Sequence, residues 1–267
     1  LRDREIALQE EVRIRGLARI ATREKIEEQA RRRLELIGIR PPAPKPKLKD
    51  EICLRLDNKV FRVVSIFVHL ILSFQLTRKD LSTLSGLDWL NDEVINFYLQ
   101  LVCQRSTETK GLPKVYAFNT FFYANISTKG YASVKRWTRK VDIFAHDLLL
   151  VPVHLNVHWC MAVIDLADKR IDYYDSLLGK NQKCLEYLKN YLVEECSDKK
   201  KQNFDLDGWK FILRTDIPRQ MNGSDCGVFA CKFAEFASRR APIVFTQEHM
   251  PYYRQRMLYE LVMKKLL

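Results

Sequence analysis

The pattern of apolar and polar positions predicts both helices and strands in the second half of the chain. Residues 88–104 (DWLNDEVINFYLQLVCQ) have helical spacing, and Asp88 or Asn91 can cap the start of this helix. Four apolar residues share its buried face: Leu90, Val94, Tyr98 and Leu101. Residues 148–155 (LLLVPVHL) are a continuous apolar run of strand length.

A hairpin and a further helix follow. Residues 158–166 (HWCMAVIDL) and 170–176 (RIDYYDS) read as two strands joined by a turn centred near Asp168. Residues 226–240 (CGVFACKFAEFASRR) return to helical spacing. This mixture predicts an α+β domain with helices packed on a central sheet.

The first part of the chain is richer in charged residues and proline. Residues 1–39 predict a charged helical arm, with acidic and basic side chains three and four positions apart. The Pro/Lys-rich residues 40–49 predict a linker, because proline stops a helix. We expect the compact domain to span residues 50–267. The apolar run 63–76 (VVSIFVHLILSFQL) is shorter than the roughly 20 residues of a membrane span, so we expect a buried core element there.

The composition argues against several classes of protein. The 267 residues are 47% hydrophobic and include seven cysteines without a C-x-x-C pair. This argues against a disulfide framework and a zinc site, and it indicates a reducing compartment. The net charge of +12 is spread along the chain, so an acidic protein partner is a simpler explanation than nucleic acid. The chain begins with Leu1 rather than Met, and we expect a fragment of a longer protein.

The segment QMNGSDCGVFAC (residues 220–231) contains the candidate nucleophile. Cys226 follows a polar turn and begins the predicted helix, where unpaired N–H groups and the helix dipole favour a thiolate. Gly223 and Gly227 lack a Cβ, so another chain can approach closely there. An inert buried thiol is the simpler alternative for an isolated cysteine.

A cysteine nucleophile also needs a base and a residue that orients the base. His158 and Asp175 come to the same open end of the predicted hairpin, so Asp175 can fix the tautomer of the imidazole. His154 remains the alternative base, because an error in strand register is easily made. Gln220, six residues before Cys226, can donate to an oxyanion together with the Cys226 backbone N–H.

Several motifs occur in order along the chain: WLNDEVINFY (89–98), VPVHLNVHWCMAVID (151–165), YYDS (173–176), PRQMNGSDCGVFACK (218–232) and FTQEHMPYYRQRM (245–257). Together they resemble the sentrin/SUMO-specific cysteine proteases of the ubiquitin-like-protein protease family (peptidase C48 type). The resemblance is strongest to its nuclear SUMO-protease branch. The resemblance implies a papain-like α+β fold with a central mixed sheet flanked by helices.

The resemblance also implies roles for individual residues. His158 would be the base, Asp175 its orienting carboxylate, Cys226 the nucleophile and Gln220 the oxyanion donor. No metal or organic cofactor is implied.

Three further positions match substrate-binding residues of the family. Trp89 and Trp159 match two tryptophans that roof a narrow tunnel for the Gly-Gly tail of SUMO, although either residue can equally be part of the core. Asp92 matches a position that pairs with an arginine of SUMO, and it also suits a helix N-terminus.

The expected function is a SUMO-specific cysteine protease that removes SUMO from lysine side chains and matures its precursor. The expected partners are SUMO and SUMO-conjugated proteins, and we expect a nuclear monomer with a cytoplasmic pool. The alternatives are a protease for another modifier such as NEDD8, an acyltransferase with the same triad, and an inactive SUMO-binding module. The apolar run near residues 63–72 departs from the family pattern.

Overall fold

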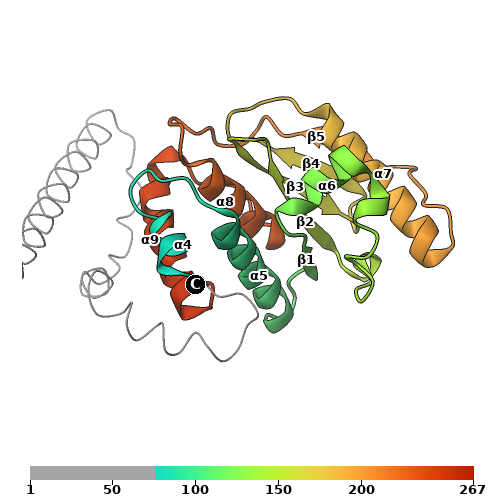
Figure 1. Cartoon of the computed structure of the whole chain (residues 1–267), viewed down its shortest axis with the longest axis horizontal. Helices are drawn as coiled ribbons and strands as arrows, with labels where there is room; N and C mark the ends of the chain where they lie inside the picture. Colours follow the sequence, from blue (N-terminus) through green and yellow to red (C-terminus); the bar gives the residue numbers. More distant parts are fainter. Residues whose placement is uncertain (1–75) are drawn as a thin grey trace, which may run out of the picture. The chain divides into compact units, whose positions relative to one another are not determined.

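The computed structural model describes residues 76–267 (Figure 1). The predicted charged arm (1–39), the predicted linker (40–49) and residues 63–75 of the apolar run lie outside the described residues. Those expectations therefore stay predictions.

A five-stranded mixed sheet forms the centre of this domain. The order of strands is β1-β2-β3-β4-β5; the outer pairs β1–β2 and β4–β5 are parallel, and the two inner pairs are antiparallel. The strands are β1 (Val115–Ala117), β2 (Leu148–His154), β3 (Trp159–Asp165), β4 (Arg170–Tyr174) and β5 (Lys210–Leu213). A mixed sheet with flanking helices confirms the predicted α+β class.

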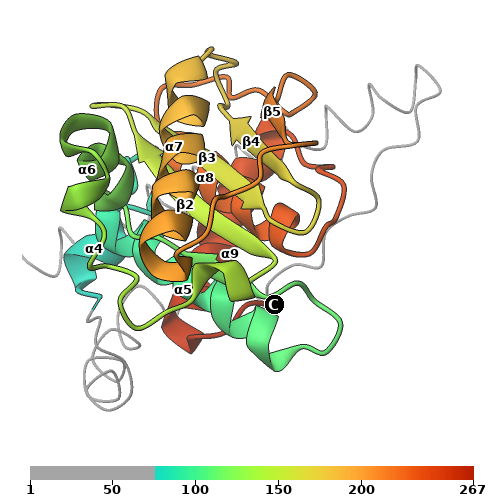
Figure 2. The same ribbon diagram turned by 90° about the vertical axis from the view of Figure 1, so that its right-hand side faces the viewer.

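Helices cover both faces of the sheet (Figures 1 and 2). One face packs against α5 (Asp92–Glu108), α8 (Cys226–Ser238) and α9 (Met250–Met263). The other face packs against α6 (Phe121–Lys129) and α7 (Gln182–Lys200). The shorter helices are α4 (Arg78–Ser82), η2 (Tyr131–Ser133), η3 (Ile143–Ala145) and η4 (Gln247–His249).

The apolar run of β2 is explained by these two helical layers. Alternate side chains of a strand point to opposite faces of a sheet. Leu148 and Leu150 accordingly belong to the core under α5 and α8, whereas Leu149 and Val151 belong to the core under α6 and α7. A strand covered on both faces has no solvent-facing side, so its sequence is apolar without interruption.

The predicted elements are present with small shifts in their ends. The N-cap of α5 is Asn91, whose side chain accepts a hydrogen bond from the Val94 N–H, so the helix begins at Asp92. Leu90 is therefore buried just before the helix and not on its face, which corrects that detail of the prediction. The predicted hairpin is β3–β4, in register Met161↔Tyr174. No helix within residues 76–267 is long and apolar enough to span a membrane.

Candidate active site

The β3–β4 hairpin brings His158 and Asp175 together. His158 immediately precedes β3 and Asp175 immediately follows β4, so both lie at the same end of the antiparallel pair. The His158 Nε2 atom lies 2.6 Å from Asp175 Oδ1. This contact is the one that the hairpin argument predicts. Because Nε2 faces the carboxylate, Nδ1 is the ring nitrogen available to a thiol.

The carboxylate of Asp175 is held firmly in a buried position. The side chain is nearly inaccessible to solvent, and Oδ1 also accepts a hydrogen bond of 2.8 Å from the Leu177 N–H. Burial raises the pKa of Asp175, but hydrogen bonding by His158 and by the Leu177 N–H outweighs it, so the pKa is lowered. On the other side of the carboxylate, a Cβ built on Gly179 would lie 2.5 Å from Oδ2. No local sequence pattern marks Gly179 as part of the site.

Cys226 is the first residue of α8 and is 2% exposed. Burial raises the pKa of its thiol, but hydrogen bonds from His158 and from the backbone N–H groups of Trp159 and Gly227 favour the thiolate, and the net effect lowers the pKa. For His158, burial lowers the pKa, but the Asp175 carboxylate outweighs it and raises the pKa well above its usual value. These shifts favour a thiolate–imidazolium pair.

A second thiol, that of Cys160, lies close to the same pair. Ligand atoms of His158, Cys160 and Asp175 lie within 4.8 Å of one another, close enough for the three side chains to hold a metal ion. The hydrogen bond between His158 and Asp175 already engages two of these three side chains. At Cys160 burial outweighs the hydrogen bonds and raises the pKa, whereas the net shift of the Cys226 pKa is downward. The two thiols are thus distinguished by their environments, and Cys226 is the more readily ionised.

Gln220, the candidate oxyanion donor, is buried and held in one orientation. Its Oε1 accepts a hydrogen bond of 2.5 Å from the Ser176 hydroxyl, and its Nε2 donates one of 2.7 Å to the Asn222 carbonyl. The backbone N–H of Gln220 also donates to the Ser176 carbonyl. An amide has two N–H donors on its nitrogen, and the bond to Asn222 uses one of them. Ser176 belongs to the YYDS motif, but no local pattern predicts that it orients Gln220.

The two tryptophans differ in exposure. Trp159 is buried, and its indole N–H donates a 3.1 Å hydrogen bond to the carbonyl of Leu90, the residue after Trp89. Trp89 itself is 51% exposed. His154, the alternative base, stacks on Trp159 with ring centroids 4.1 Å apart. His154 therefore contacts the tryptophan, while His158 contacts the carboxylate.

Asp92, Gly223 and Gly227 are the remaining predicted site residues. Asp92 is half-buried in the first turn of α5, where a carboxylate complements the helix dipole. Gly223 is exposed, and among the described residues no atom lies within 4 Å of a Cβ built on it. A Cβ on Gly227 would lie 2.9 Å from the Cβ of Leu90, so the close neighbour of this glycine is a side chain of the protein itself.

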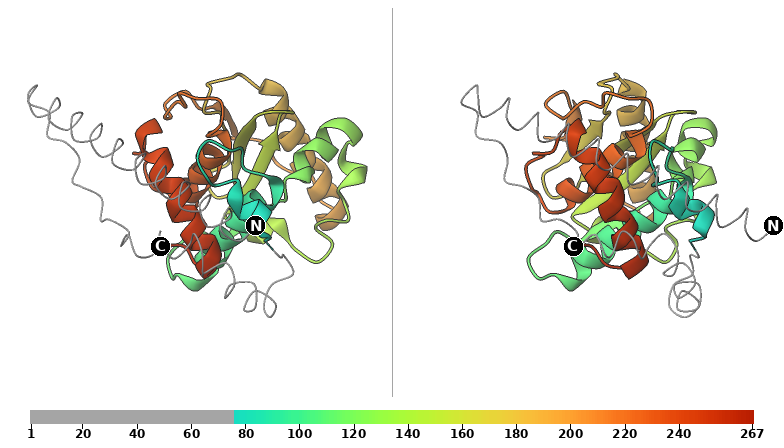
Figure 3. Two further views of the ribbon diagram at one scale, coloured as in Figure 1. Left: turned by 60° about the vertical axis from the view of Figure 1, so that its left-hand side comes forward. Right: turned by 90° about the vertical axis from the view of Figure 1, so that its left-hand side faces the viewer.

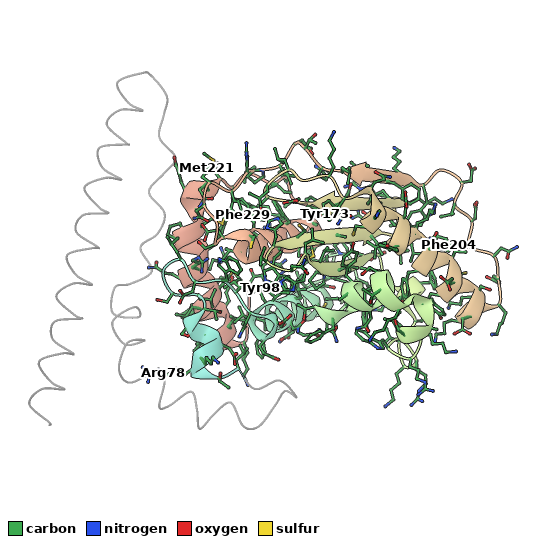
Figure 4. All side chains as sticks on the ribbon, turned by 45° about the horizontal axis from the view of Figure 1, so that its top comes forward. Arg78, Tyr98, Tyr173, Phe204, Met221 and Phe229 are labelled. Atoms are coloured by element: carbon green, nitrogen blue, oxygen red, sulfur yellow. The ribbon has the colours of Figure 1, made fainter. Side chains whose placement is uncertain are left out.

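Figure 4 shows how the loop before α8 relates to the core. Met221, which follows Gln220, lies at the edge of the domain and is 77% exposed. Phe229, one turn into α8, is fully buried. The loop thus passes from solvent into the core within one helical turn of Cys226.

Comparison with known proteins identifies the family. Residues 88–266 match the Ulp1 protease family, C-terminal catalytic domain. The chain is 56% identical over 276 aligned residues to a sentrin-specific protease of Caenorhabditis elegans, covering 100% of this chain and 40% of that protein. It is 44% identical over 195 residues to sentrin-specific protease 2 of Mus musculus, covering 72% of this chain and 33% of that protein. The chain thus spans less than half the length of these relatives.

Solved structures agree with this assignment. The C-terminal Ulp1 protease domain in complex with Smt3, the yeast ortholog of SUMO, is 31% identical with a TM-score of 0.63, covering 77% of this chain and 95% of that chain. SUMO protease Ulp1 with its catalytic cysteine oxidised to a sulfonic acid is 30% identical with a TM-score of 0.65, covering 78% and 95%. The chain belongs to the Ulp1 family of cysteine proteases.

Proposed function

We propose that this chain is a SUMO-specific cysteine protease that cleaves after the C-terminal Gly-Gly of SUMO. The observation that carries the proposal is the arrangement at the start of α8. A thiol with a lowered pKa lies beside an imidazole whose other nitrogen is 2.6 Å from a buried carboxylate. Nucleophile, base and orienting group are the three parts that a cysteine protease requires.

In the first half of the reaction, the Cys226 thiolate attacks the carbonyl carbon of the terminal glycine and forms a C–S bond. The negative charge moves to the carbonyl oxygen, where the free N–H of the Gln220 amide and the Cys226 backbone N–H donate hydrogen bonds. The intermediate collapses, and the C–N bond breaks as the His158 imidazolium gives its proton to the leaving amine. The amine is a lysine side chain in deconjugation and a peptide amine in precursor maturation.

In the second half, water hydrolyses the thioester. The neutral His158 imidazole accepts a proton from water as its oxygen attacks the acyl carbon. The C–S bond then breaks and restores the Cys226 thiolate, and the modifier leaves as a carboxylic acid that loses its remaining proton to solvent. Asp175 stays ionised throughout and stabilises the imidazolium. The cycle needs no external oxidant, reductant or metal.

The choice of SUMO as the modifier is supported by the relatives. Two of them are named sentrin-specific proteases, and one solved relative is bound to the yeast ortholog of SUMO. In this proposal, Trp89 and Trp159 roof the path of the Gly-Gly tail and Asp92 pairs with an arginine of SUMO. Gly223, which is exposed and has open space above its backbone, admits the extended tail beside Cys226.

The experiment is a comparison of cleavage rates for matched substrates. SUMO, NEDD8 and ubiquitin would each be joined to the same lysine-containing peptide, and the SUMO precursor would be a fourth substrate. We expect cleavage of both SUMO substrates, abolished in Cys226→Ser and retained in Cys160→Ser, because the pKa of only the former thiol is lowered. Preferential cleavage of the NEDD8 substrate would identify a NEDD8 protease. SUMO binding without cleavage by the folded wild-type protein would identify an inactive binding module.

Three further expectations belong to the same proposal. A nuclear location, a monomeric state and the absence of nucleic-acid binding are inferred from the family resemblance and the dispersed charge. Fluorescence microscopy of the tagged full-length protein, light scattering and a nucleic-acid binding assay test them in turn.

A further inference from the structure

The residue before the nucleophile, Asp225, makes unusual hydrogen bonds for its position. It is the N-cap of α8, where an aspartate normally accepts a hydrogen bond from a backbone N–H of the first turn. Within the described residues, the Asp225 side chain makes no such cap hydrogen bond. Its buried carboxylate accepts hydrogen bonds from three other side chains: Asn222 and Gln247, both at 2.7 Å from Oδ2, and Arg254, at 2.8 Å from Oδ1.

Arg254 is the charged partner in this group. It comes from α9 and is 3% exposed, so its ion pair with Asp225 is buried on both sides. Its other nitrogens donate to the Ser224 carbonyl at 3.0 Å and to the Thr83 carbonyl at 3.1 Å. The guanidinium therefore joins the loop before Cys226 to α9 and to the end of α4, which lie side by side in Figure 3.

Gln247 holds the same loop at a second point. Its Oε1 accepts a 2.7 Å hydrogen bond from the Met221 N–H, while its Nε2 donates to Asp225. Gln247 and Arg254 both belong to the FTQEHMPYYRQRM motif (245–257), and neither has a local sequence signal for this role. In the structure, this motif supplies two donors that hold the nucleophile loop, the half-buried Gln247 and the buried Arg254.

From this geometry we infer that Arg254 is a positioning residue for the nucleophile, an inference that rests on the proposed function of Cys226. Arg254 holds the Asp225 carboxylate away from the first turn of α8 and balances its negative charge. The first-turn N–H of Gly227 is then available to the Cys226 thiolate rather than to a capping carboxylate. Without Arg254, a buried negative charge next in sequence to the thiolate would be unbalanced, and it would oppose ionisation of the thiol.

Charge balance predicts that substitution of Arg254 and substitution of Asp225 shift the ionisation midpoint of the Cys226 thiol in opposite directions. Arg254→Met leaves the Asp225 carboxylate unbalanced, so the pH at which the Cys226 thiol is half ionised rises, by about one pH unit. Asp225→Asn leaves the Arg254 guanidinium unbalanced, so this midpoint falls by a similar amount. The double variant removes both charges, and its midpoint returns close to that of the wild type. A purely structural role would not produce this alternation of sign.

The test is the rate of alkylation of Cys226 by iodoacetamide in a pH series from about 5 to about 10. Peptide mass spectrometry reports the modification of Cys226 separately from that of the other cysteines. The control is Arg105→Met, which breaks the ion pair between Arg105 and Glu235 near the opposite end of α8. We expect this control to keep the wild-type midpoint. Circular dichroism establishes that each variant is folded.

Equal midpoints in all the folded variants, or shifts of the same sign in both single variants, would overturn the inference. If Arg254→Met does not fold, Asp225→Asn alone still tests the inference, since the midpoint must fall below the wild-type value. The assay contains no SUMO substrate. A protein with the predicted midpoint shifts but without SUMO cleavage would therefore refute the proposed substrate and leave the charge balance intact.

Discussion

Gly179 provides a way to move the catalytic carboxylate without removing it. In Gly179→Ala, the new Cβ would lie 2.5 Å from Asp175 Oδ2, far inside the contact distance of carbon and oxygen. The atom that must give way is the end of a side chain, so we expect the backbone to keep its fold. The carboxylate must rotate or shift, however, and its other oxygen accepts the hydrogen bonds of His158 and of the Leu177 N–H.

The size of the effect follows from those hydrogen bonds. A hydrogen bond to a charged group contributes about 1.5–3 kcal/mol. If the shift removes the contribution of the His158–Asp175 bond to the transition state, kcat/KM falls roughly 10- to 100-fold, since about 1.4 kcal/mol corresponds to a factor of ten. The free energy of unfolding should fall by no more than the same amount, about 1.5–3 kcal/mol, so the variant is expected to stay folded.

The assay is the hydrolysis of a fluorogenic amide at the C-terminus of SUMO, with thermal unfolding measured on the same samples. Lys180→Ala is the matched control, because it changes the next residue of the loop and truncates a side chain exposed to solvent. We expect the control to retain kcat/KM within about twofold, as is usual for surface substitutions. A folded Gly179→Ala enzyme with wild-type kcat/KM would refute the reasoning that the position of the Asp175 carboxylate limits the reaction.

Two further predictions concern ionisation and the oxyanion donor. Because the pKa of Cys226 is lowered and that of His158 is raised, the reactive thiolate–imidazolium pair forms as the pH rises through the thiol pKa. It is lost only when the imidazolium loses its proton at a pH above the usual histidine value, so a pH–rate profile that already falls near about 6.5 would contradict the assignment. Ser176→Ala removes the donor to Gln220 Oε1 and leaves the side-chain amide held only by its hydrogen bond to the Asn222 carbonyl. We expect kcat to fall several-fold with little change in KM in steady-state measurements, whereas an equal rise in KM alone would indicate a substrate-binding role.

The elements that the sequence predicts well are those with strong local patterns. The β3–β4 hairpin has two apolar runs and a short turn, and its antiparallel pairing places His158 beside Asp175. The start of α8 at Cys226 is marked by the change from turn-forming to apolar residues. The proximity of Cys160 to Asp175 could have been predicted in the same way, because continuing the register Met161↔Tyr174 by one pair places Cys160 opposite Asp175.

Other parts of the site depend on contacts between distant segments. Ser176 orients Gln220 across 44 positions, and Arg254 reaches Asp225 across 29 positions. Such pairs have no periodic signal in one sequence, because only the packing of complete elements brings them together. Gly179 is similar, since its proximity to a carboxylate depends on the path of the loop after β4.

The most direct test of the account uses electrophilic probes built on the C-terminal Gly-Gly of SUMO, NEDD8 and ubiquitin. Each probe would be incubated with the wild-type chain, Cys226→Ser and Cys160→Ser, and covalent adducts would be measured by intact mass. The account predicts an adduct with the SUMO probe that is lost in Cys226→Ser and retained in Cys160→Ser. A SUMO adduct that persists in Cys226→Ser, or no adduct with the SUMO probe in folded wild-type protein, would contradict it.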